Sequence, residues 1–248
     1  MRVAALYDIH GNLPALEAVL RDVRQAGVDR VVVGGDVVLG PMPRETLECL
    51  LHLDVPVQFI EGNCDREVVA QMMGTAAGTL PERVREGVRW VAQQLGPEHE
   101  SLMGSWPKTL GVRIDGMGEV LFCHATPRND SEIFTRRTPE ERLVPVFEGV
   151  DAPLVVCGHT HMQFDRKIGG VRVVNAGSAG MPFGEPGADW LLLGPDVELR
   201  HTNYDLDDAA ERIRATTYPQ AEEFAARNVL HPPSEREMQE LFSRGELK

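Results

Sequence analysis

Residues 2–36 read RVAALYDIHGNLPALEAVLRDVRQAGVDRVVVGGD, and this pattern predicts a strand, a helix and a second strand in succession. Residues 2–7 and 30–33 are short apolar runs, as expected for strands that are buried on both faces of a sheet. Between them, apolar residues recur at i, i+3, i+4 and i+7 from Leu16, which is the spacing of one helix face. We therefore expect two parallel strands joined by a helix.

The rest of the chain extends this unit and then changes character. Residues 44–51 predict a second helix and 57–60 a third strand, whereas strands after residue 106 are joined mostly by short glycine-containing turns. Helix-connected strands followed by hairpin-rich strands predict an α/β (α+β) fold, in which a two-sheet β-sandwich is flanked by helices. The expected later strands are 111–115, 119–123, 154–157, 171–175, 190–193 and 197–200, with helices near 84–95 and after 138–139.

The 248 residues fit one large domain or two small ones. From residue 205 the chain is rich in alanine, glutamate and arginine, and it predicts helices interrupted at Pro219 and at Pro232-Pro233. We expect residues 1–204 to form the functional domain. Residues 205–248 are expected to be a C-terminal helical appendage of the same domain that carries none of the chemistry.

Composition limits the partners. Lys+Arg is 25 and Asp+Glu is 38, so the net charge of −13 should repel nucleic acids and anionic membranes. No apolar run approaches the ~20 residues of a transmembrane helix, and the first apolar run is too short for a signal peptide. We expect a cytoplasmic protein with reduced thiols. A membrane partner is not expected, nucleic acid is disfavoured as a structural partner, and a homo-oligomer stays open.

Polar residues follow five of the predicted strands, at the point where each strand ends. Taken singly, an aspartate there is usually a cap or turn residue, and a lone histidine is usually structural. Cap, turn or structural roles do not readily explain five successive strand ends that all carry such residues. The carboxyl ends of strands in α/β sheets converge on one edge. The candidate metal ligands at these ends are Asp8, His10, Asp36, Asn63, His124, His159 and His161.

This set of residues favours a pair of metal ions. Asp8 and His10 are two residues apart, so on an extended chain their side chains would point the same way, and the same holds for His159 and His161. Imidazole and carboxylate ligands together suit Mn, Fe, Zn or Ni. Seven ligands suit two ions ~3.5–4 Å apart that share a carboxylate.

The charge of such a site favours a phosphate substrate. Two divalent ions contribute +4, the carboxylates of Asp8 and Asp36 contribute −2, and a bridging hydroxide contributes −1. The sum of about +1 would attract a phosphate ester into an otherwise acidic protein. A metal pair also lowers the pKa of bound water towards ~7 and thus supplies a nucleophile.

These motifs resemble the calcineurin-like metallophosphoesterase family, whose pattern is D-x-H, G-D, G-N-H-[DE], a single histidine and G-H-x-H. Within that family the chain is most similar to the small bacterial and archaeal phosphodiesterases, which also share a turn like the one at residues 175–178. The matching blocks are Asp8-Ile9-His10, Gly35-Asp36, Gly62-Asn63-Cys64-Asp65, His124 and Gly158-His159-Thr160-His161.

The resemblance implies a metal-dependent phosphoesterase, with phosphodiesters preferred. A metal-bridging hydroxide would attack phosphorus in line, and two divalent transition-metal ions would be the cofactors, with manganese favoured over iron, zinc or nickel. A small phosphate ester is the expected substrate. By the same resemblance, Asp8, His10 and His161 would hold the first ion, Asn63, His124 and His159 the second, and Asp36 would bridge both.

One position departs from the family pattern. Cys64 stands where most members have a histidine that is thought to protonate the leaving group or bind phosphate. A thiol with pKa ~8.5 is a poor substitute for imidazole, so we interpret Cys64 as a spacer, although it and Asp65 remain candidate catalytic residues. The candidate substrate-binding residues are Asn63, Arg66 and Arg128.

Two other interpretations stay open. A non-catalytic binding or scaffold protein on the same fold should have lost a ligand such as Asp36, and none is missing. A mononuclear zinc hydrolase on an unrelated fold would leave several of the candidate ligands unexplained.

Overall fold

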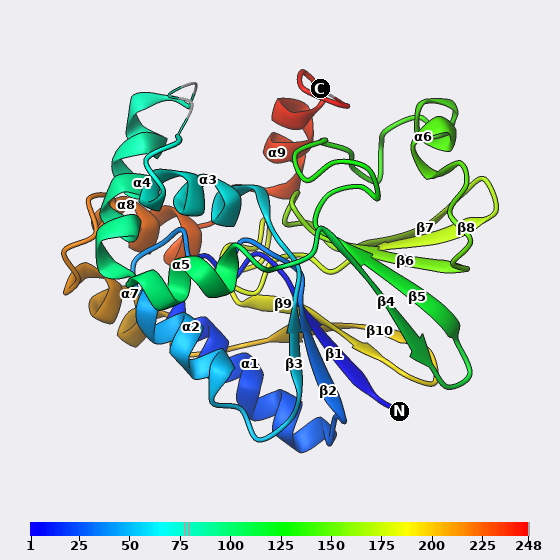
Figure 1. Cartoon of the computed structure of the whole chain (residues 1–248), viewed down its shortest axis with the longest axis horizontal. Coiled ribbons are helices and arrows are strands. Elements are labelled where there is room, and N and C mark those ends of the chain that lie inside the picture. Colours follow the sequence, from blue (N-terminus) through cyan, green and yellow to red (C-terminus); the bar gives the residue numbers. More distant parts are fainter. Residues whose placement is uncertain (77, 79, 248) are drawn as a thin grey trace.

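The computed structural model of the chain describes residues 1–76, 78 and 80–247. Within them, two five-stranded sheets pack face to face, with helices on the outside (Figure 1). The predicted two-sheet sandwich flanked by helices is confirmed.

The first sheet contains the predicted strand–helix–strand unit at its centre. Its strand order is β10-β9-β1-β2-β3. Strands β1, β2 and β3 are parallel because helices connect them, whereas β9 and β10 form an antiparallel hairpin. The carboxyl ends of the three parallel strands therefore meet at one edge. The bounds are β1 Val3–Leu6, β2 Arg30–Val33, β3 Val57–Phe59, β9 Ala188–Leu193 and β10 Val197–Thr202.

The second sheet has the order β4-β5-β6-β8-β7, in which β5, β6 and β8 are parallel. Strand β7 was not predicted. It places Asp165, Arg166 and Lys167 in succession at the edge of the sheet, where charged residues block further pairing but also hide the strand pattern. The bounds are β4 Thr109–Ile114, β5 Gly118–Cys123, β6 Leu154–Cys157, β7 Phe164–Ile168 and β8 Val171–Asn175.

Three apolar layers hold these elements together. Tyr7 and Val32 of the first sheet pack against Phe122 and Val156 of the second in a core between the sheets. A second core joins the first sheet to helices α1–α5, and a third joins the second sheet to α6. The helices are α1 Leu13–Ala26, α2 Pro43–Leu51, α3 Asn63–Met72, α4 Glu82–Gln94, α5 Pro97–Met103 and α6 Glu140–Phe147.

From residue 206 the chain is helical, as predicted. It forms α7 (Leu206–Arg214), α8 (Ala221–Phe224), the π-helix η1 (Ala225–Leu230) and α9 (Glu235–Phe242). The first three share a buried apolar cluster, against which side chains from two earlier loops, Met42 and Met181, also pack. These helices are thus attached to the loops at the carboxyl edge of the sheets. In the described part of the chain, no helix has both the length and the apolar character to cross a bilayer.

Candidate metal centre

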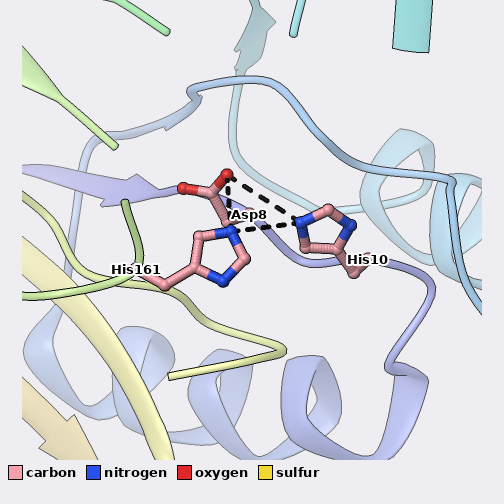
Figure 2. A group of neighbouring side chains, drawn as sticks. All are labelled: Asp8, His10 and His161. Carbon is pink, nitrogen blue, oxygen red and sulfur yellow. Dashed lines mark hydrogen bonds and ion pairs between the residues drawn. The ribbon is translucent and has the colours of Figure 1, made fainter. Parts of the chain in front are cut away.

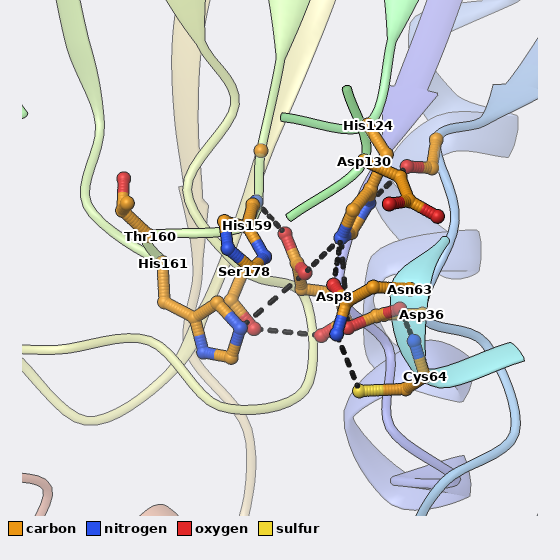
Figure 3. Close-up of polar contacts among 12 residues, drawn as sticks. Asp8, Asp36, Asn63, Cys64, His124, Asp130, His159, Thr160, His161 and Ser178 are labelled. Carbon is orange, nitrogen blue, oxygen red and sulfur yellow. Dashed lines mark hydrogen bonds and ion pairs between the residues drawn. The ribbon is translucent and has the colours of Figure 1, made fainter. Parts of the chain in front are cut away.

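The predicted ligands come together at the carboxyl edge of both sheets (Figure 3, with His10 labelled in Figure 2). Asp8 follows β1, Asp36 follows β2, and Asn63 follows β3 as the first residue of α3. His124 and the His159–His161 pair follow β5 and β6 of the second sheet. Because β5 and β6 are parallel neighbours, as are β1, β2 and β3, all five ends point to one place.

Asp8, His10 and His161 form a first group of ligand atoms within 4.8 Å of one another (Figure 2). Nε2 of His161 lies 3.3 Å from Oδ1 of Asp8 and 3.3 Å from Nε2 of His10. All three side chains are buried or nearly so. This is the group that the resemblance assigned to the first metal ion.

The hydrogen bonds of these imidazoles leave their lone pairs facing one another. Nδ1 of His10 lies 3.2 Å from the carbonyl of Leu39, and Nδ1 of His161 lies 2.9 Å from that of Met181. A carbonyl only accepts, so Nδ1 carries the proton in each ring and Nε2 is an acceptor in the neutral form. Buried Oδ1 of Asp8 has no hydrogen-bond donor among the described residues. Acceptors that converge in this way fit a bound cation.

Asp36, His124 and His159 form a second group, which Asn63 joins. The amide oxygen of Asn63 is 3.0 Å from Nε2 of His124 and equally close to Nδ1 of His159. Nδ1 of His124 faces the Gly34 carbonyl at 2.9 Å, which again makes Nε2 an acceptor in the neutral ring. In this orientation the amide oxygen of Asn63 faces two ring nitrogens, and a cation between them would make the arrangement favourable. Without a cation, the amide would have to flip so that its NH₂ group donates to these nitrogens.

Asp36 lies between the two groups. Its Oδ2 is 3.8 Å from Nε2 of His10 in the first group and 3.6 Å from Nε2 of His124 in the second. Its Oδ1 accepts a hydrogen bond of 2.8 Å from the backbone N–H of Cys64. The position of Asp36 therefore suits a carboxylate that two ions share.

The backbone at these ligands is not extended. Asp8, His10, Asp36, His159 and His161 all have φ between 51° and 67°, in the left-handed region. The sequence-based expectation that paired ligands lie on extended chain is therefore wrong. A left-handed conformation costs a non-glycine residue about 1–2 kcal/mol, although aspartate and histidine tolerate it better than most. Strain concentrated in this way is typical of a functional site.

The glycines of the motifs let ligand-bearing loops approach closely. A Cβ on Gly62 would lie 2.2 Å from the backbone nitrogen of Asp36, and one on Gly158 would lie 2.4 Å from Oδ2 of Asp8. Neither contact is possible without moving a ligand. The G-N and G-H dipeptides are thus steric requirements of the centre.

The turn at residues 175–178 supports two of these loops from behind. The Ser178 hydroxyl donates to the carbonyl of Asp8 at 2.7 Å, and the Asn175 amide donates to the carbonyl of Gly158 at 2.6 Å. All of these groups are buried. The turn connects the loop after β1 to the loop after β6, and so fixes the distance between their ligands.

Burial and neighbouring charges shift the pKa values of the candidate ligands. Burial lowers the pKa of His10, and it lowers that of His159 to about 4, so both rings are neutral at pH 7. Burial alone would raise the pKa of Asp8 and lower that of His161. The neighbours of each group, with the other member of this pair first, together outweigh burial, so the pKa of Asp8 is lowered and that of His161 is raised. A metal ion would compete with protons for the same ring nitrogens.

The side chain of Cys64, which was interpreted as a spacer, lies close to the candidate metal ligands. Its sulfur lies within 4.8 Å of the ligand atoms of His10 and Asp36. Burial, followed by the negative charge of Asp36, raises the pKa of the thiol well above its usual range. A raised pKa disfavours the thiolate that a nucleophile would need.

Asp65 faces away from the ligands. It is 1% exposed, and its Oδ1 accepts hydrogen bonds of 2.9 and 3.2 Å from the backbone N–H groups of Val37 and Val38. Burial, followed by the charge of Asp36, raises the pKa of Asp65 to about 7. Asp65 thus shapes the loop that follows Asp36. A catalytic role for it stays a prediction.

The two arginines that were expected to grip phosphate are held by carboxylates. Arg66 donates to Asp130 at 2.7 Å, and Arg128 donates to Glu132 at 2.6 Å. Neither arginine is among the described residues that line the cavity at the ligands. Their role in binding substrate stays a prediction.

A cavity of about 460 Å³ opens onto the ligands. His10, Asp36 and His161 form part of its floor, whereas Tyr218 and Met238 of the C-terminal segment line its walls. Residues 205–248 thus contribute to the lining of the cavity, and the expectation that they carry none of the chemistry stays a prediction. Sequence patterns could not reveal this contact, because only the tertiary structure brings the segment to the strand ends.

Comparisons with known proteins agree with this arrangement. Residues 1–194 match the calcineurin-like phosphoesterase superfamily domain. An uncharacterized protein of Methanocaldococcus jannaschii is 26% identical over 242 residues, covering 88% of this chain and 94% of its own. The phosphodiesterase YfcE of Escherichia coli is 28% identical over 206 residues, covering 79% of this chain and 89% of its own.

Solved structures share the fold. The metallophosphoesterase from Sphaerobacter thermophilus is 28% identical, with a TM-score of 0.68 over 91% of this chain and 99% of its own. A protein from Pyrococcus horikoshii OT3 is 23% identical, with a TM-score of 0.79 over 94% and 99% of the two chains. The fold is thus not the unrelated one that a mononuclear zinc hydrolase required. Since the family match extends over most of its length, the chain belongs to the calcineurin-like phosphoesterase superfamily.

Proposed function

We propose that the chain is a phosphoesterase that uses two metal ions and prefers phosphodiesters. The observation that carries this proposal is the position of Asp36, whose Oδ2 lies 3.8 Å from a nitrogen of one ligand group and 3.6 Å from a nitrogen of the other. The mixed imidazole and carboxylate ligands suit manganese, iron, zinc or nickel, and the resemblance to the family favours manganese among them. Two divalent ions would supply the attacking water and neutralise the charge on the phosphoryl oxygens.

The residues around the centre have separate tasks in this proposal. Backbone carbonyls orient the rings of His10, His124 and His161, so that each presents Nε2 to the centre. The backbone N–H of residue 64 orients Asp36 from the other side. Ligands held in this way do not need to reorganise when the ester binds, which is where preorganised sites gain their rate.

Two observations bear on which ester the chain would prefer. The relative YfcE is named a phosphodiesterase. In addition, position 64 holds a thiol in place of the imidazole that would assist a poor leaving group. The ester hydrolysed best should therefore have a good leaving group.

We expect hydrolysis of bis(p-nitrophenyl) phosphate to depend on added Mn²⁺ and to stop in excess EDTA. The reason is that the proposed nucleophile is water that only the ions activate. The measurement is nitrophenolate release before and after chelation, with re-addition of Mn²⁺ as the control. Full activity in protein that elemental analysis finds free of metal would contradict the proposal.

Cys64→Ala should keep activity on this diester within about tenfold of wild type. The backbone N–H that orients Asp36 is retained, whereas loss of a general acid or base would cost ~10²–10⁴-fold. Cys64→His should in turn raise the rate for alkyl phosphomonoesters, whose leaving group needs a proton.

The matched control for these variants is Cys49→Ala, which removes another half-buried thiol outside the centre. A loss of a thousandfold or more in Cys64→Ala, with metal content unchanged, would show that the thiol takes part in the reaction.

A further inference from the structure

The cavity above the ligands has one wall of a different character from its floor. The polar ligands, including His10 and His159, line one part of the cavity, the floor, and α4 and residues 218–238 line another part, the wall. In Figure 1, α4 and α8 lie near each other at one side of the molecule. The second of these wall segments lies beyond the residues 1–194 that match the family domain.

Apolar atoms make up most of the exposed surface of this cavity. On the wall, Val84 of α4 and Phe224, Tyr218 and Met238 of the C-terminal segment supply aliphatic and ring surface, and Gln220 and Asn228 are its uncharged polar residues. Phe183 joins the wall to the floor, because its ring stacks on the His161 ligand with centroids 5.2 Å apart and an interplanar angle of 19°. An organic group attached to a phosphate at the centre would therefore meet aromatic and aliphatic surface directly.

Charged groups on the wall are largely compensated or lie at its rim. Arg83 forms an ion pair with Glu223, so these two neutralise each other. Arg227 also lines the cavity, but it is exposed. The interior of the wall thus offers little to a charged or strongly hydrated group.

We propose that this wall is a subsite for the organic group of the substrate, and that it selects phosphodiesters in which one alcohol carries an apolar ring. The inference rests on the proposed function, since it needs the phosphate at the ligands. The volume of about 460 Å³ lies within the range of ~300–1,000 Å³ in which proteins bind small molecules. Burial of a ring against this wall would add affinity in proportion to the apolar area removed from water.

Binding of two phosphonates tests the subsite without turnover. Phenylphosphonate and methylphosphonate have the same charged head, and their C–P bond is not an ester. We expect calorimetric titration of the Mn²⁺-loaded protein to show roughly tenfold tighter binding of phenylphosphonate, because the ring adds apolar area that becomes buried. Equal affinities in the wild type would overturn the proposal.

Variants of the wall residue Val84 provide a second test of the subsite. Val84 is 38% exposed, so Val84→Trp fills the cavity from a surface position, and Val84→Asp places a charge there without filling it. Either variant should bring the ratio of the two dissociation constants close to one. Val144→Trp is the matched control: Val144 is 41% exposed on α6, away from the cavity, and this variant should keep the wild-type ratio. An unchanged ratio in both Val84 variants would also overturn the proposal.

Failure of the subsite and failure of the proposed function give different results. If the wild type hydrolyses bis(p-nitrophenyl) phosphate but binds the two phosphonates equally, the subsite is wrong and the phosphoesterase stands. If it prefers phenylphosphonate in the Mn²⁺-dependent binding but hydrolyses no diester, the subsite stands and the activity is wrong.

Discussion

Asp36→Asn is expected to lower kcat/KM for a nitrophenyl diester by at least about 10³-fold. Loss of a partner outside the ligand shell of a metal typically costs roughly 10–100-fold, and Asp36 contacts both ligand groups directly. The amide keeps an oxygen that can accept from the Cys64 backbone, so the loop should stay in place. What is lost is the negative charge that two cations would share.

Metal content gives the second measurement for this variant. We expect elemental analysis after Mn²⁺ loading to give two ions per chain for the wild type and no more than one for Asp36→Asn. Asp189→Asn is the matched control, since Asp189 also pairs with an imidazole, that of His201 at 2.8 Å, but outside the centre. Saturation of the wild type at one equivalent, with Asp36→Asn binding the same amount, would rule out the dinuclear proposal.

The parts of the fold that sequence predicted are those in which a local pattern repeats. The strand–helix–strand unit at residues 2–36 was recognisable because its apolar residues follow the period of each element. Strand β7 was missed because three successive charged residues, 165–167, obscure the alternation. Helix α3 was not predicted because its apolar stripe is weak: within Asn63–Met72, only Asp65 and Val68 are buried.

For the centre, the order of the motifs identified the residues but not the geometry that unites them. Asp8 and His10 were expected on extended chain, whereas both are left-handed. No hydrophobic period signals such a conformation, since it depends on close approaches such as that of Gly62 to Asp36. The apolar wall was missed for a related reason. Tyr218 and Met238 are far from the motifs in sequence, and only the packing of the C-terminal helices brings them to the cavity.

Asp65 is the residue at which a sequence-based catalytic role and the observed contacts differ most. Its carboxylate accepts from two successive backbone N–H groups, those of Val37 and Val38, in the loop that carries Asp36. Its other oxygen is buried and has no hydrogen-bond partner among the described residues. We infer from these contacts that Asp65 holds the loop.

Asp65→Ala should therefore act on stability first. Each buried donor that loses its partner costs about 1–3 kcal/mol, so the free energy of unfolding should fall by about 2–6 kcal/mol for the two N–H groups. Metal affinity should fall with it, because the loop after Asp36 is no longer held. Urea denaturation of the metal-free protein measures the first effect, and Mn²⁺ titration measures the second.

Asp65→Asn separates this positioning role from a catalytic one. The amide oxygen can still accept from Val37 and Val38, and loss of the charge relieves repulsion from Asp36, which offsets the cost of burying the new NH₂ group. Stability within about 1 kcal/mol of wild type, two bound ions and activity within about tenfold would be the signature of a residue that orients the loop. An asparagine variant that folds and binds both ions, yet loses the ~10²–10⁴-fold expected for a general acid or base, would instead show that the Asp65 carboxyl itself exchanges a proton in the reaction.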